Sequence, residues 1–146
     1  MNRALFERLM DLALWCAGAG HFVALCASFQ VPFRLKWKQD LAQLMPFNRK
    51  LLWVQSSFTV LNIIAFGSMT LALHSEMIRG DRAAIGIAGW IACFWSARIL
   101  VDIFYFEHKD WPQGRIFVVG HTLLTSLFVF FAATYWSLVI SRMFFS

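Results

Sequence analysis

Residues 83–106 read AAIGIAGWIACFWSARILVDIFYF, an apolar stretch that carries two charged side chains, Arg98 and Asp102, one helical turn apart. About 20 apolar residues with a rise of about 1.5 Å each cross the hydrocarbon core of a bilayer, so this stretch is long enough to span a membrane. An ionised side chain at membrane depth costs roughly 2.5–3.5 kcal/mol on insertion scales, and such residues face a bundle interior, a wet cavity or each other. The stretch therefore predicts a transmembrane helix with a polar site on it.

The composition of the whole chain is typical of a membrane protein. Of its 146 residues, 60% are hydrophobic, 17% are aromatic and only 14% are charged. A soluble domain is about 45–50% apolar and about 25% charged. The formal net charge of +5 comes from basic residues that lie between apolar segments, which favours anionic lipid headgroups over nucleic acid as partners. The cysteines lie in apolar segments without the spacing of zinc ligands, so we expect no metal site of that kind.

Four segments reach spanning length, namely residues 10–31, 51–73, 83–106 and 116–140. The connections after the second and third segments are short, which places consecutive helices side by side in opposite directions. We therefore expect one domain of residues 1–146 with an all-α fold, an antiparallel up-down bundle of four transmembrane helices. The expected location is a membrane, with a bacterial inner membrane as the predicted one.

The longer connection, residues 32–50, reads PFRLKWKQDLAQLMPFNRK. Its mixture of basic and apolar residues between two prolines predicts a short amphipathic helix in the membrane interface, with Trp37 as an anchor. One face of the membrane would carry Arg34, Lys36, Lys38, Arg49, Lys50, Lys109 and Arg115, and the other Arg3, Arg8, Arg79, Arg82 and Arg142. The positive-inside rule therefore favours the cytoplasm for the connections between helices one and two and between helices three and four. The excess is small, and the inverted orientation stays open.

Depth counted from the face with those two connections brings polar side chains of several helices into one leaflet half. The candidate ligand-binding residues are Gln55, Thr59, Asn62, Arg98, Asp102, Tyr105, His121 and Thr125. Arg98, Asp102 and His121 are also the candidates for catalysis, since arginine binds an anion or a carbonyl and the other two groups exchange protons. The alternative role for the same residues is interhelical hydrogen bonding, worth about 0.6–2 kcal/mol for each bond.

Two histidines, His21 and His121, lie within spanning segments, and two imidazoles on facing helices are able to ligate a haem iron. Counted from the same face, His21 lies about 10–12 residues deep and His121 about 5, which is an offset of about 8–10 Å along the membrane normal. Haem ligands need nearly equal height, so this offset disfavours a haem between them. The sequence assigns no cofactor.

Small residues follow two of the predicted helices at spacings that allow close helix contacts, namely Ala13, Ala17, Gly20 and Ala24 on the first and Gly86, Gly89, Cys93 and Ala97 on the third. The leading functional hypothesis is an accessory subunit or binding module that packs against other membrane subunits or a second copy. Such a module would hold a lipid-like or quinone-like ligand in the polar pocket. The alternatives are a membrane enzyme acting on a lipid-like substrate through Arg98, Asp102 and His121, and a redox carrier of haem or quinone.

Overall fold

The computed structural model describes residues 3–105 and 114–144, and this part of the chain is helical without any strand. Its long helices are α1 (Arg3–Ser28), α4 (Pro46–Ala72), α6 (Arg82–Phe104) and α7 (Arg115–Phe144). Short helices connect them: α2 (Val31–Arg34), α3 (Trp37–Asp40), the 3-10 helix η1 (Leu41–Gln43) and α5 (His74–Arg79).

The four long helices confirm the four predicted apolar segments, and each is long and apolar enough to span a membrane. They extend beyond the predicted bounds at several ends: α4 begins at Pro46 rather than at residue 51, and α7 continues to Phe144 rather than to residue 140. A proline in the first turn explains the early start of α4, because its fixed φ suits a helix and its missing N–H would have no partner there. Residue 106, the predicted end of the third span, lies outside the described residues.

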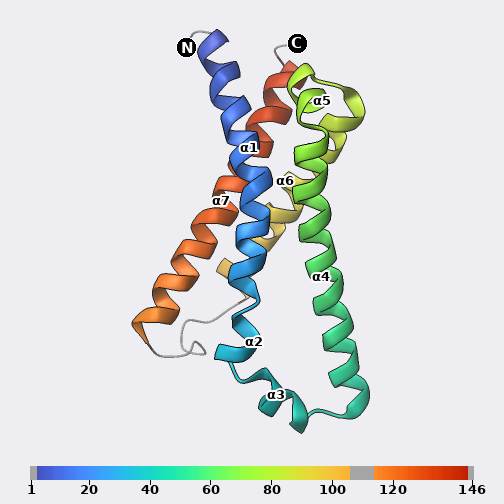
Figure 1. Cartoon of the computed structure of the whole chain (residues 1–146), viewed down its shortest axis with the longest axis vertical. Coiled ribbons are helices and arrows are strands. Elements are labelled where there is room, and N and C mark those ends of the chain that lie inside the picture. The colour runs from blue at the N-terminus through green and yellow to red at the C-terminus, as the bar shows by residue number, and fades with distance from the viewer. Residues whose placement is uncertain (1–2, 106–113, 145–146) are drawn as a thin grey trace.

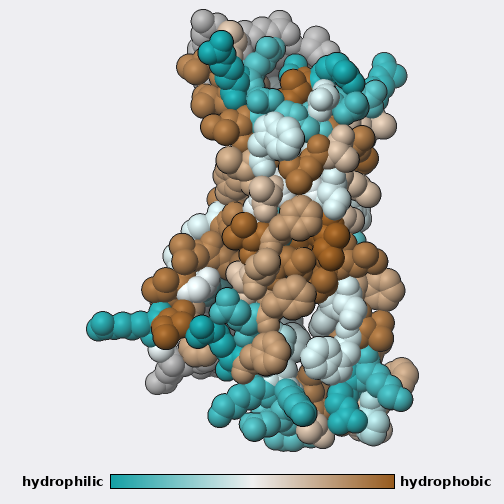
Figure 2. All heavy atoms as spheres, viewed as in Figure 1, coloured by the Kyte–Doolittle hydropathy of each residue, from teal (hydrophilic) through white to brown (hydrophobic). Residues whose placement is uncertain are grey.

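The surface has the distribution that a membrane requires. On the face seen in Figure 2, hydrophobic residues occupy the middle of the molecule and hydrophilic residues gather at both ends. The two termini and α5 lie at one end, and α2 and α3 lie at the other (Figure 1). Helix α1 packs against α4 and α7, and α6 packs mainly against α7. Four apolar helices of this kind fit a small membrane protein.

The connection of residues 32–50, predicted to form a short amphipathic helix, contains several shorter helices instead of one. The structure divides this connection into α2, α3 and η1, followed by the start of α4. Lys36, between α2 and α3, has a φ of 50°, in the left-handed region. A right-handed helix cannot continue through that conformation, so Lys36 separates two single-turn helices. The rings of Trp37 and Trp53 meet edge to face at 6.4 Å and attach the connection to α4.

At the other end a tight turn joins α5 to α6. Gly80 ends α5 in a left-handed conformation with a φ of 81°, which glycine adopts without steric cost. Asp81 then caps α6, because its carboxylate accepts hydrogen bonds from the backbone N–H groups of Ala83 and Ala84 at 3.0 and 3.3 Å. The turn therefore fixes where α6 begins.

The core occupies only one half of the molecule, which we call the packed half: residues 3–25, 63–95 and 128–144. Its largest buried side chains are Trp95, Tyr135, Phe131, Leu14, Met77, Ile91 and Leu138. The remaining described residues, 26–62, 96–105 and 114–127, form the open half, and none of them is fully buried. In the open half α4 diverges from α6 and α7 (Figure 1).

Glycine allows α1 and α4 to meet closely in the packed half. A Cβ atom on Gly67 would lie 3.1 Å from the carbonyl oxygen of Gly18 and 2.8 Å from Cε2 of Phe22. On α1, Ala17 and Ala24 of the predicted small-residue face are buried inside the chain. On α6 the corresponding face stays largely open, since a Cβ on Gly86 would meet no atom within 4 Å.

Candidate functional site

His21 lies at the centre of the packed half, where α1 places it among aromatic rings. It is fully buried, and its ring stacks on Phe131 with centroids 4.2 Å apart. Its Nδ1 lies 2.7 Å from the carbonyl oxygen of Ala17, and its Nε2 lies 3.0 Å from Nε1 of Trp95. A carbonyl only accepts and an indole N–H only donates, so His21 must carry its proton on Nδ1 and accept from Trp95 through Nε2. Both nitrogens are thus engaged in a neutral ring.

This arrangement separates the two histidines considered for haem. His121 lies ten residues before Phe131 on α7, which corresponds to about 15 Å along the helix. His21 stacks on Phe131, so it does not lie at the level of His121. Its Nε2 already accepts a hydrogen bond from Trp95 and is not available to bind a metal. The two imidazoles therefore cannot ligate one iron in this structure.

A second buried hydrogen-bond chain joins α4 to α7 in the packed half. The hydroxyl of Thr70 lies 2.7 Å from the carbonyl oxygen of Phe66 and 2.6 Å from the hydroxyl of Tyr135. The carbonyl only accepts, so Thr70 donates to it and Tyr135 donates to Thr70. Trp95, Thr70 and Tyr135 were not predicted as hydrogen-bond partners from the sequence, although a buried indole N–H or phenol O–H usually has an acceptor.

The open half contains a different cluster, built around Asp102 in the last turn of α6. One carboxylate oxygen lies 2.9 Å from Nε2 of His121 and accepts a hydrogen bond from the hydroxyl of Thr125 at 3.2 Å. The other oxygen lies 3.5 Å from Nη1 of Arg98, four residues earlier on α6. The guanidinium of Arg98 also lies over the ring of Phe128, 5.5 Å from its centroid. Helices α6 and α7 thus bring together four of the predicted residues.

Burial differs sharply within this cluster. The side chain of Asp102 is 9% exposed, whereas those of Arg98 and His121 are 38% and 32% exposed. The carboxylate is therefore covered by its donors, and the two donors reach the surface. Asp102 lies two residues before the end of α6, and Arg98 six, or about 9 Å from that end. Both residues therefore lie in the last two turns of α6.

The predicted residues on α4 do not join the cluster. Gln55, Thr59 and Asn62 are exposed, and α4 packs mainly against α1 rather than against α6 or α7. The hydroxyl of Thr59 donates to the carbonyl oxygen of Gln55 at 3.1 Å. The side-chain amides of Gln55 and Asn62 have no hydrogen bond within the described part of the chain. Tyr105, at the end of α6, is 77% exposed.

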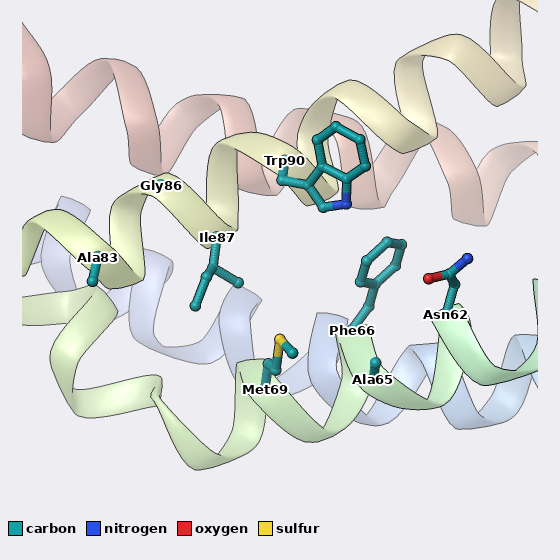
Figure 3. Close-up of a pocket in the computed structure, with 8 residues that line it drawn as sticks. All are labelled: Asn62, Ala65, Phe66, Met69, Ala83, Gly86, Ile87 and Trp90. Carbon is teal, nitrogen blue, oxygen red and sulfur yellow. The ribbon is translucent and has the colours of Figure 1, made fainter.

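A cleft of about 420 Å³ separates α4 from α6 near the boundary of the two halves. Figure 3 shows Asn62 at one end of it and Met69, Ala83 and Ile87 toward the other. Trp90 and Phe66 lie between them, and the missing side chain of Gly86 leaves room along α6. Apart from the Asn62 amide and the Trp90 indole, the lining side chains are apolar.

Among the residues that the structure describes, no three histidine, cysteine, aspartate or glutamate side chains come together as metal ligands. None of the protein-family models, curated proteins or solved structures compared with the chain matches it.

Proposed function

We propose that the protein is a subunit of a membrane complex and binds another transmembrane helix along the open half of α4. The observation that carries this proposal is the pair of exposed amides on a helix long and apolar enough to span a membrane. Asn62 lies 16 residues after Pro46, about 24 Å along a helix that is about 40 Å long, and therefore at mid-membrane depth. An amide in an apolar environment costs roughly 2–7 kcal/mol without a hydrogen-bond partner.

Lipid tails offer no hydrogen bond, whereas a polar side chain on a neighbouring helix does. Gln55, Thr59 and Asn62 recur at spacings of four and three residues, which places them on one face of α4. Interhelical hydrogen bonds of this kind contribute about 0.6–2 kcal/mol each in membranes. The exposed apolar residues beside them, including Val54 and Phe58, suit contact with lipid and with protein equally. They therefore do not distinguish a lipid-facing surface from a helix-binding surface.

The orientation forms part of the same proposal. We place the four spans as an antiparallel bundle in a bacterial inner membrane, with residues 29–50 and 105–114 on the cytoplasmic side because basic residues concentrate there. Reporter domains fused after Gln39 and after Ser146 should report opposite sides. Reporters that both indicate the same side would contradict this topology.

Co-purification tests the partner. The wild-type chain, extracted in mild detergent, should elute with a second polypeptide, either another protein or a differently tagged copy of itself. Asn62→Leu combined with Gln55→Leu should release that partner. The matched control is Thr122→Val, because Thr122 is exposed on α7 and its hydroxyl already bonds the carbonyl oxygen of Val118. A wild-type chain that elutes as a monomer without any other polypeptide would overturn the proposal.

The Asp102 cluster favours a second function, the binding of an amphiphile with an oxygen-rich head such as a phosphate or a quinone. Its support is the partial exposure of Arg98 and His121 beside the largely buried carboxylate, since the guanidinium of Arg98 carries several N–H donors for such oxygens. The alternative that this cluster catalyses a reaction on a lipid-like substrate uses the same residues.

Mass spectrometry of bound small molecules separates these possibilities. Arg98→Gln should lose a co-purified amphiphile that the wild type retains, while Arg82→Gln, an exposed arginine at the other end of α6, should retain it. Recovery of a phospholipid or of a quinone identifies the kind of head group that the cluster binds. Recovery of a chemically modified lipid favours the alternative that the protein is an enzyme. Identical small-molecule content in wild type and Arg98→Gln would contradict the proposal that the Asp102 cluster binds a ligand.

A further inference from the structure

Charge is distributed unequally between the two ends of the molecule. The end that carries the connection between α1 and α4 has a set of exposed basic side chains, which we call the basic rim: Arg34, Lys36, Lys38, Arg49, Lys50 and Arg115. Among the described residues of the open half, the acidic side chains are Asp40 and Asp102, and Asp102 is already engaged by His121 and Thr125. Within the described part of the open half, the six basic side chains of the rim therefore outnumber the two carboxylates.

The opposite end has basic residues too, but carboxylates accompany them. Arg79 forms an ion pair with Glu76 at 2.9 Å, and Asp81 caps α6 directly before Arg82. Glu7 and Asp11 lie on the first turns of α1 at the same end. The contrast between the two ends is therefore one of net charge and not merely of the number of basic residues.

The basic rim also exposes large apolar side chains at the level where the spans end. Phe33 is 84% exposed, Met45 71% and Phe47 72%. They lie in α2, immediately before α4 and in its first turn, between the basic residues. Basic and aromatic side chains mixed in this way match the boundary between lipid headgroups and acyl chains, where apolar groups insert and ammonium or guanidinium groups meet phosphate.

We infer that the basic rim binds anionic phospholipids in the leaflet that it faces. Each lysine or arginine near a membrane surface is attracted to anionic headgroups, and this attraction is screened by salt over a Debye length. The left-handed turn at Lys36 lays α2 and α3 across the end of the bundle, so that several basic residues contact the same leaflet. This inference does not depend on the partner proposed for α4.

Spin-labelled lipids test this inference. The full chain is reconstituted into phosphatidylcholine vesicles, and its association with spin-labelled phosphatidylglycerol is compared with that of spin-labelled phosphatidylcholine by electron paramagnetic resonance. The wild type should prefer phosphatidylglycerol at low salt and lose most of that preference at high salt.

The combined variant Arg34→Gln, Lys36→Gln and Lys38→Gln should lower the preference by about threefold or more. The control Arg8→Gln, Arg79→Gln and Arg82→Gln removes the same charge from exposed residues at the other end and should leave the preference nearly unchanged. Equal losses in both variants, or a wild type without any preference, would overturn the inference. If the rim variant fails to fold, the salt titration of the wild type decides the matter by itself.

Discussion

His21 and His121 lie in different halves of the molecule and have opposite surroundings. His21 is fully buried, with both ring nitrogens engaged by Ala17 and Trp95 and its face covered by Phe131. His121 is a third exposed and contacts a carboxylate. A polar residue in a membrane helix has a structural role where its hydrogen bonds are made inside the core. It is accessible to other molecules where its side chain reaches the surface. The packed half thus contains the core of the fold, and the open half is where we propose that binding occurs.

The largest effect should follow from Trp95→Ala in the packed half. Trp95 is 1% exposed, donates to His21 and stacks on Phe128 at 4.6 Å. Its loss should lower the free energy of unfolding by about 3–5 kcal/mol, measured by denaturation in detergent micelles. Trp90→Ala is the control, because Trp90 is 67% exposed and should cost far less. Equal costs for the two variants would contradict the assignment of Trp95 to the core.

Gly67→Ala should have the second largest effect on stability, because its Cβ would clash with the carbonyl oxygen of Gly18 on the facing helix. Separation of α1 and α4 should cost about 1–3 kcal/mol in the same denaturation experiment. Gly86→Ala, where the added carbon meets no atom within 4 Å, should instead be neutral or stabilising by up to about 1 kcal/mol. A destabilised Gly86→Ala would indicate that the cleft beside α6 is filled.

Tyr135→Phe removes one donor from the packed half and should cost about 1 kcal/mol. The cost is limited because Thr70 keeps its hydrogen bond to the carbonyl oxygen of Phe66. Tyr105→Phe, at a side chain that is 77% exposed, supplies the matched control and should change the unfolding free energy much less. A larger effect at Tyr105 than at Tyr135 would contradict the assignment of the core.

Asp102→Asn should have the smallest effect on stability, below about 1 kcal/mol. The amide oxygen of asparagine can still accept hydrogen bonds from His121 and Thr125, so the contacts of this side chain are weakened rather than lost. The same variant should reduce the co-purification of an amphiphile, as mass spectrometry can show. A loss of stability as large as that of Trp95→Ala would show that the cluster has a structural role.

Hydropathy and length predicted the four long helices because a membrane-spanning helix needs only a sufficient run of apolar residues. They did not predict the division of residues 32–50, since that division depends on one left-handed residue, Lys36, which composition does not specify. For such segments amphipathic composition indicates the interface but not a continuous helix.

The candidate site was predictable only in part. Depth counting predicted that Asp102 and His121 lie at one level, and the structure places them 2.9 Å apart. It also grouped Gln55 and Asn62 with them, but the structure shows no hydrogen bond from either to the Asp102 cluster, because depth gives the level of a residue but not the neighbour of its helix, and α4 packs mainly against α1. The pairing of His21 with Trp95 depends on the rotation of two helices, which no spacing in the sequence specifies.

The most direct test of the account places a photo-crosslinking amino acid at position 62 on α4 in intact membranes. The exposed amide there predicts an adduct that contains a second polypeptide, whereas the same probe at position 122 on α7 should capture lipid. Adducts with lipid alone at both positions would contradict the claim that the open half of α4 binds a partner helix.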